Sequence, residues 1–154
     1  MKKESVLRVY IEYLEKKVRK TEEALNAIYE GIDSAPTPSQ SHSDTTRSQQ
    51  SRVASETATR LSSLKTTRAS MAFMQSKKST TPEIGALIVV EDVGFKDKEY
   101  YFVVPDGGGE SIEFEGTEIL FVSTRAPILE ALSKIKTGDF FEFRGRRLVL
   151  IEIS

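Results

Sequence analysis

The chain has 154 residues, of which 38% are hydrophobic and 29% are charged, with a formal net charge of −1. This length allows one domain or two very small ones, and it excludes a large enzyme with separate cofactor and substrate domains. There is no Cys, which excludes disulfides, thiol catalysis and thiolate metal sites. The single His, His42, excludes multi-His metal centres and argues against a Ser-His-Asp triad.

The distribution of apolar residues argues against a membrane protein. No unbroken apolar run is longer than five residues, whereas a membrane-spanning helix needs roughly 20. The first residues, MKKESVLRVYIEYLEKK, are charged throughout and contain no apolar secretory segment. We therefore expect a soluble, cytoplasmic protein.

The near-zero net charge hides two unlike halves. Residues 1–81 carry 14 Lys/Arg and nine Asp/Glu, whereas residues 82–154 carry eight and 14. Seven of the eight Phe also lie in the second half, and the polar stretch Gln75–Pro82 separates the two. This composition predicts an N-terminal helical domain over 1–78 and a β-rich C-terminal domain over 82–154.

Apolar residues in the first part of the chain recur with heptad spacing. The resulting seam consists of Leu7, Ile11, Leu14, Val18, Thr21, Leu25, Ile28 and Ile32. Steps that alternate between four and three residues are typical of a coiled coil. No Pro occurs before Pro36, and Gly31 is a plausible stop signal. The pattern predicts one helix of about 28 residues.

A second helix is predicted after a short break. Residues 33–43 contain two prolines and no large apolar side chain, so they predict a tip loop. Ser43 or Asp44 is a good N-cap for a helix that runs from Asp44 to about Met74. Its weaker seam consists of Val53, Thr57, Leu61, Leu64, Arg68 and Met71. Two such helices predict an antiparallel coiled-coil hairpin, and the alternative is a disordered Ser/Thr-rich linker over 34–67.

Short apolar and alternating runs predict strands in the second half. They are Ile84–Val93, Glu99–Val104, Ser111–Phe114, Glu118–Ser123, Phe140–Phe143 and Arg147–Ile153. Residues Ala126–Ile135 have helical spacing, and Pro127 suits a first helical turn. The whole chain therefore predicts an α+β fold, in which a helical hairpin is followed by a small antiparallel sheet with one short helix.

Candidate catalytic groups are few. Residues 106–109 (DGGG) are rich in Gly but lack the strand-to-helix phosphate-loop pattern, so they predict a flexible turn. His42 has no Cys or His partner and fits a solvated loop residue. Asp33 and Asp44 flank the tip loop, where two carboxylates could complete a Mg²⁺ site that a partner supplies. A helix cap at Asp44 and a turn at Asp33 would explain the same spacing.

The predicted second helix is predominantly basic. Residues 44–78 carry seven Lys/Arg and only two Asp/Glu. Such a surface attracts nucleic-acid phosphates, although a solvated helix face can have the same composition. Arg47, Arg52 and Arg60 are the candidates for contact with RNA.

One segment resembles a known family. Val122–Leu132 (VSTRAPILEAL), continued by Lys136–Asp139 (KTGD), is similar to the C-terminal pattern of the GreA/GreB family of bacterial transcript-cleavage factors. In that pattern a strand ends in Ser and is followed by Ser-Pro-(Ile/Leu)-Gly-x-Ala-Leu-Leu, then by Lys-x-Gly-Asp before the final hairpin. Here Ala126 replaces the Ser before Pro127, and Leu129 replaces the Gly. The predicted helical hairpin matches the family in plan and weakly in sequence.

The resemblance implies a function in transcription elongation. It implies an FKBP-like C-terminal domain that docks at the rim of the RNA polymerase secondary channel, with Ala126, Pro127 and Ile128 shaping the docking surface. The coiled coil would enter the channel, and acids at its tip would help hold the second Mg²⁺ while the polymerase hydrolyses backtracked RNA. The protein would then be no enzyme itself and would have no cofactor of its own beyond the Mg²⁺ of the polymerase active site. We expect a monomer that binds RNA polymerase and contacts the nascent RNA.

The tip departs from the family pattern, which reads Gly-Asp-x-x-Glu-Asn. The nearest segment, Ser43–Ser48, keeps Asp44 as the first acid and has Arg47 in place of the second. An Arg side chain cannot bind Mg²⁺ and repels it. Asp33 or Glu30 could compensate, although neither lies at the family position. The resemblance therefore leaves open both stimulation of cleavage and a non-cleaving competitor in the channel.

Two other classes of function remain as alternatives. A coiled-coil adaptor would present the hairpin to a partner, and a dimer formed through the Leu7–Ile32 seam would favour it. A prolyl isomerase would follow from an FKBP-like fold, but the chain has no Trp for the aromatic pocket of such an enzyme.

Overall fold

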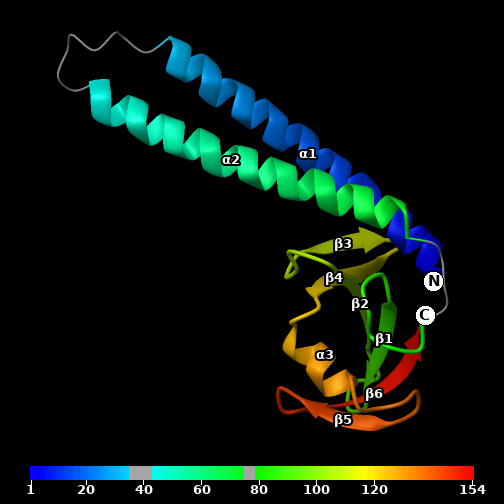
Figure 1. The fold of residues 1–154 in the computed structure, drawn as a ribbon. Coiled ribbons are helices and arrows are strands. Elements are labelled where there is room, and N and C mark those ends of the chain that lie inside the picture. Colours follow the sequence, from blue (N-terminus) through cyan, green and yellow to red (C-terminus); the bar gives the residue numbers. More distant parts are fainter. Residues whose placement is uncertain (35–42, 75–78) are drawn as a thin grey trace. The chain divides into compact units, whose positions relative to one another are not determined.

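The computed structural model describes residues 1–34, 43–74 and 79–154, with the side chains of 43–46 outside the description. The chain divides into two compact units (Figure 1). The helical unit is Ile11–Ala72, and the sheet unit joins Met1–Tyr10 to Phe73–Ser154. The first ten residues therefore belong to the sheet unit. That 1–78 and 82–154 behave as separate domains stays a prediction.

The helical unit is a hairpin of two long helices, as predicted. Helix α1 spans Lys3–Asp33 and helix α2 spans Ser43–Ala72. Each residue of the predicted α1 seam is buried or half-buried, and Leu14 retains only 3% exposure. The heptad pattern therefore identifies the inward face of α1 correctly. Among the described residues, no helix combines the length and the apolar character needed to cross a membrane.

Ion pairs between the helices fix their antiparallel pairing. Arg68 Nη2 lies 2.5 Å from Glu15 Oε1, and Lys65 Nζ lies 2.6 Å from Glu22 Oε1. All four side chains are about half exposed, so each pair contributes at most about 1 kcal/mol. The apolar seam must therefore supply most of the stability of the hairpin, and the ion pairs define its register.

The seam of α2 differs from the prediction at its beginning. Val53 is 48% exposed, whereas its neighbour Ala54 is 3% exposed. Placing Val53 in the seam is therefore wrong. Positions 53, 57 and 61 are each four residues apart, so they shift progressively around the helix, whereas 54, 57 and 61 combine steps of three and four and stay on one face. Arg68 also lies on the surface, where it pairs with Glu15. The alternative of a disordered 34–67 is wrong from Ser43 onward, because these residues are helical.

The sheet unit contains six strands. They are β1 (Leu87–Asp92), β2 (Lys98–Val104), β3 (Ser111–Phe114), β4 (Thr117–Ser123), β5 (Phe140–Phe143) and β6 (Arg146–Ile153). Their order in the sheet is β3-β4-β2-β1-β6-β5. Each strand was predicted to within three residues at its beginning and one at its end, and the predicted α+β class is confirmed.

One strand pairing is parallel in a sheet that the sequence predicted to be antiparallel throughout. Strands β2 and β4 pair in parallel, with Phe102 opposite Phe121, while the other four pairings are antiparallel. The reason is topological. Strand β3 forms a hairpin with β4 at the sheet edge and leaves β4 next to β2. Since β3 reverses the chain between them, β2 and β4 run in the same direction.

A short helix covers one face of the sheet. Helix α3 spans Pro127–Leu132 and buries Ile128, Leu129 and Leu132. It is shorter than the predicted Ala126–Ile135, and Ile135 follows it in a turn. The core beneath α3 is formed by alternate residues of the central strands: Ile88, Val90, Tyr101, Val103, Val122, Leu148 and Leu150.

The beginning of α1 packs on the opposite face. The ring centroid of Tyr10 lies 4.6 Å from that of Phe121 and 5.7 Å from that of Phe102, in edge-on geometry. Val6, Phe102 and Phe121 have at most 1% exposure. Burial raises the pKa of Tyr10 to about 12, and the nearby carboxylates of Glu110 and Asp106 add to this effect. Residues 1–10 thus complete the core of the sheet unit.

We expect Tyr10→Ala to lower the free energy of unfolding by about 3 kcal/mol, because it opens a cavity against two buried Phe rings. The measurement is urea unfolding followed by circular dichroism. The matched control is Tyr29→Ala, since Tyr29 is 47% exposed, and its effect should stay within about 0.5 kcal/mol. Equal effects of the two substitutions would contradict the packing of residues 1–10 on the sheet.

Candidate functional site

The predicted tip acids lie at one end of the helical unit. Asp33 is the last residue of α1 and is exposed, and Asp44 is the second residue of α2. The hairpin brings these two chain positions to the same end of the helix pair (Figure 1). Residues 35–42, which include His42, and the Asp44 side chain lie outside the described residues. The predicted geometry of the two carboxylates therefore stays a prediction.

The described part of the chain does not form a metal centre by itself. Among the described residues, no three His, Asp or Glu side chains gather into a candidate metal site. Mg²⁺ usually takes only one or two carboxylates from a protein and fills its other positions with water or phosphate oxygens. A carboxylate at this tip would therefore need further ligands from another molecule.

The predicted RNA-contacting arginines are exposed along α2. Arg52 Nε donates to Glu56 Oε1 at 3.0 Å, but both side chains are largely solvated, so this pair holds Arg52 weakly. Arg47 and Arg60 are also exposed. The pKa of Lys17 on α1 is lowered by burial and also by the positive charge of Arg60. Arg60 and Lys17 thus contribute to one region of positive potential on the helical unit.

The predicted docking residues lie where β4 leads into α3. Ala126 precedes the helix with extended dihedrals, φ −64° and ψ 133°, and its N–H donates to the Ser123 carbonyl at 2.9 Å. Pro127 occupies the first helical turn, where its fixed φ is favourable and no N–H is required. Pro127 is exposed, whereas Ile128 is 3% exposed and packs into the core. Only part of the predicted surface is therefore accessible to a partner.

A cavity of about 300 Å³ adjoins this segment. Its lining includes Ala126, Pro127 and Ile128 together with Gly107, Gly108, Gly109, Ser123, Phe143, Arg144 and Arg146. Gly108 has φ +112°, and a Cβ built there would lie 2.9 Å from the Ser123 backbone nitrogen. The glycine turn therefore packs closely against the end of β4. The glycine turn and the segment around Pro127, which are separate in the sequence, thus line one recess.

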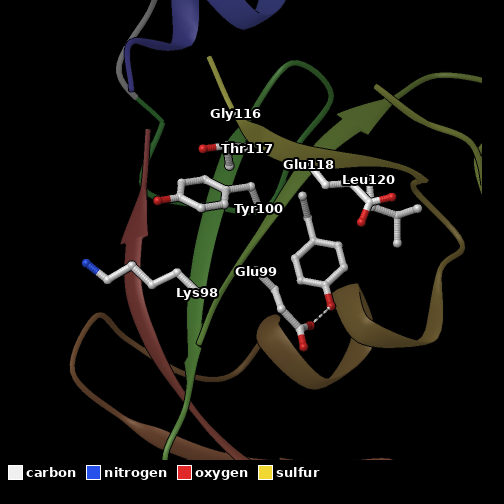
Figure 2. Close-up of a pocket in the computed structure, with 8 residues that line it drawn as sticks. Lys98, Glu99, Tyr100, Gly116, Thr117, Glu118 and Leu120 are labelled. Carbon is white, nitrogen blue, oxygen red and sulfur yellow. Dashed lines mark hydrogen bonds between the residues drawn. The ribbon is translucent and has the colours of Figure 1, made fainter. Parts of the chain in front are cut away.

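A polar cluster on the α3-covered face was not predicted from the sequence. Glu99 accepts hydrogen bonds from the hydroxyl of Tyr101 and from both terminal nitrogens of Arg146. The dashed line at Glu99 in Figure 2 marks the first of these bonds. Asp92 is 4% exposed, and its Oδ2 lies 3.6 Å from Arg146 Nη1. Asp92 Oδ1 accepts from the backbone N–H groups of Gly94 and Phe95 at 2.8 and 3.1 Å. The cluster thus joins β1, β2 and β6.

Hydrogen bonding outweighs burial in its effect on the pKa of Glu99. Burial alone would raise the pKa of Glu99, but hydrogen bonds from Arg146 and Tyr101 favour the carboxylate and lower the pKa overall. The pKa of Tyr101 is raised by burial and by its bond to Glu99. The pKa of Arg146 is raised by the same carboxylate. All three groups therefore keep one charge state near neutral pH, which suits a structural network better than acid–base catalysis.

A sequence signal for Glu99 exists but is incomplete. Glu99 alternates with Tyr101 and Val103 on the core-facing side of β2, which is an unusual place for a carboxylate. That pattern predicts a partner of opposite charge. Naming Arg146 as that partner requires the strand order, because it lies 47 residues away.

A hollow of about 490 Å³ lies at the beginning of β2 and β4. Figure 2 draws the residues that line it. Lys98, Tyr100, Thr117 and Glu118 line it together with Glu99. Its charged groups have both signs, and they do not converge on one point in this view (Figure 2). The hollow therefore suggests no particular reaction.

Comparisons with known proteins find distant structural neighbours only. No protein-family model matches the chain, and no curated protein matches it either. The crystal structure of GreA factor homolog 1 (Gfh1) of Thermus thermophilus is 15% identical with a TM-score of 0.38, and the match covers 94% of both chains. A structure described as the transcription factor Gfh1 is 15% identical with a TM-score of 0.38, covering 93% of this chain and 92% of the other. Thermus aquaticus Gfh1 is 17% identical with a TM-score of 0.35, covering 92% of each chain. At these TM-scores and identities we draw no functional conclusion from the neighbours.

We expect Glu99→Gln to lower the free energy of unfolding by about 1 kcal/mol at neutral pH, a modest value because Glu99 is partly solvated. The folded-state pKa of Glu99 lies below its ordinary value of 4.5, so its contribution is present above that value. It is lost as the pH falls through the folded-state pKa. Urea unfolding from pH 7 to pH 3 should therefore show that the free energies of unfolding of the wild type and of Glu99→Gln become equal at acidic pH. The control is Glu113→Gln on the exposed side of β3. A difference from wild type that is constant with pH would contradict the assignment.

Proposed function

We propose that this chain is a transcription factor that binds RNA polymerase, with its hairpin in the secondary channel and its sheet unit at the rim. The observation that carries the proposal is the hairpin itself. Two helices of 31 and 30 residues share one narrow seam and otherwise present mostly polar side chains, with acidic residues where they meet the tip. Such a hairpin suits a solvent-filled channel, because it exposes only isolated apolar side chains and no broad apolar face.

The sheet unit supports the proposal through its docking segment. Residues Val122–Leu132, which resemble the GreA/GreB motif, adopt one compact arrangement of strand end, proline turn and short helix. Pro127 is exposed beside a recess that also contains Arg144. A partner surface with apolar and acidic groups would complement this recess.

The hairpin would act by lending a group to the enzyme rather than by catalysing alone. Asp44 would face the polymerase Mg²⁺ ions, with Asp33 as a weaker helper, and Arg47, Arg52 and Arg60 would face RNA phosphates. The metal ions of the polymerase would activate the attacking water and stabilise the leaving oxygen. The role of this chain is to place a carboxylate at the site and to hold the RNA end near it.

A second candidate role is supported by one specific residue. Arg47 is exposed in the second turn of α2, where the family has its second acid. A positive charge at that position opposes metal binding. A factor with this tip would occupy the channel and compete with cleavage factors without stimulating hydrolysis.

The decisive assay uses a backtracked elongation complex with Mg²⁺. If the chain stimulates cleavage, Asp44→Ala should reduce the rate at least about tenfold, because a lost metal ligand removes transition-state stabilisation. Asp97→Ala, an exposed Asp on the β1–β2 turn, is the matched control. Binding without cleavage, restored to cleavage by Arg47→Glu, would assign the competitor role. No binding to the polymerase at all would contradict both roles.

A second prediction concerns docking. Pro127→Glu should weaken binding to the polymerase about tenfold or more, because it places a charge on the rim of the recess, where buried charges are costly. The fold should persist, since an acid is favourable in the first turn of a helix. Thr137→Glu adds the same charge at an exposed position away from the recess and serves as the control. Equal affinities of the two variants, measured by competition binding, would exclude this surface.

A further inference from the structure

A groove of about 310 Å³ lies between α1 and α2 near the tip end of the helical unit. Ala27, Ile28 and Gly31 of α1 line one side, and Gln49, Gln50 and Val53 of α2 line the other. The small residues on α1 leave this space open. A Cβ built at Gly31 would lie 4.0 Å from Gln50 Nε2, so any longer side chain there would enter the groove.

The side chain of Gln50 has one buried polar atom without a partner among the described residues. Its Oε1 is buried and accepts no hydrogen bond within the part of the chain that the structure describes. A buried acceptor without a donor is unfavourable, and a ligand that supplies the donor removes that cost. The terminal amide of Gln rotates easily about its last torsion, so its oxygen and nitrogen can both be offered to a planar ligand.

Val53 gives a second and independent indication. It is 48% exposed on a helix whose outward residues are otherwise almost all polar. The seam does not use it, since Ala54 takes that role. Its side chain instead forms a lip of the groove, opposite Ile28. An apolar wall on each side and a carboxamide between them match a flat ring with a hydrogen-bonding edge.

We propose that this groove binds a nucleobase of single-stranded RNA. Adenine fits best among the bases, because its N6 amino group and N7 offer the donor and acceptor that a Gln carboxamide pairs with. Arg47 and Arg52 lie within one turn of Gln50 on α2 and are exposed, so they are placed to meet the adjoining phosphates. Glu30 and Asp33 end α1, so the phosphates should pass on the α2 side of the groove.

The identity of the RNA rests on the proposed function, which brings the end of backtracked RNA close to the hairpin tip. The groove itself rests only on its geometry, so it can be tested without polymerase. Loss of base binding with polymerase binding intact would overturn this inference alone. Base binding without polymerase binding would overturn the proposed function alone.

The experiment titrates the full-length protein with hexa-adenylate and with an abasic ribose-phosphate hexamer of equal charge. Methyl resonances of Ile28 and Val53 are followed by NMR. The expected result is that hexa-adenylate shifts both resonances and the abasic hexamer shifts neither. The substitutions to test are Gln50→Leu, Val53→Ser and Gly31→Leu. Each should weaken hexa-adenylate binding about fivefold or more, because the loss of one contact to a base typically lowers the affinity by at least that factor.

Ser63→Leu places a leucine on an exposed part of α2 and is the control for Gln50→Leu. It should leave the affinity unchanged. Helical circular dichroism of every variant distinguishes lost binding from lost folding, and Gly31→Leu and Val53→Ser test the groove without touching the carboxamide. Equal shifts with the abasic hexamer, binding that leaves Ile28 and Val53 unmoved, or no binding at all would each overturn the proposal.

Discussion

The packing of Tyr10 on Phe102 and Phe121 is the contact on which the sheet unit depends. The central strands are apolar on both faces, and α3 covers only one of them. The second face needs a cover, and residues 1–10 provide it. Because these residues begin α1, one continuous helix contributes to both units of the chain. The small core of a unit of this size thereby gains aromatic contacts that residues 82–154 alone would lack.

The helical unit follows a different physical rule. Its seam is narrow and contains Thr and Ala among larger residues, so the two helices bury little beyond that stripe. Exposed ion pairs such as Glu15 with Arg68 define the register of the two helices but contribute little to their stability. Because the seam contains small side chains, a groove remains near the tip, where Gly31 and Ala27 line the α1 side. A hairpin built in this way presents mostly polar side chains along its length, and the groove and the proposed tip carboxylates lie near one end.

Much of the fold follows from periodicity in the sequence. The heptad from Leu7 to Ile32 predicts the inward face of α1. Runs such as 87–90 and 101–104 predict strands, and the structure shows that both faces of these strands are buried. The parallel pairing of β2 with β4 was not predictable, since local pattern does not say which strand becomes a neighbour. The Glu99–Arg146 pair was not predictable for the same reason, because it depends on the strand order β2-β1-β6. The prediction that Val53 lies in the seam was wrong, because it relied on the apolar character of Val53 although Ala54 has the better spacing.

The proposed function requires the end of the hairpin to reach the catalytic centre of a polymerase while the sheet unit stays outside. Photo-crosslinking tests it most directly, with benzoyl-phenylalanine placed at Arg47 and, separately, at Pro127, in a backtracked complex with end-labelled RNA. We expect position 47 to crosslink to the RNA 3′ segment and position 127 to crosslink only to polymerase protein. Crosslinks to RNA from position 127, or none from position 47 in a complex that contains the bound factor, would contradict it.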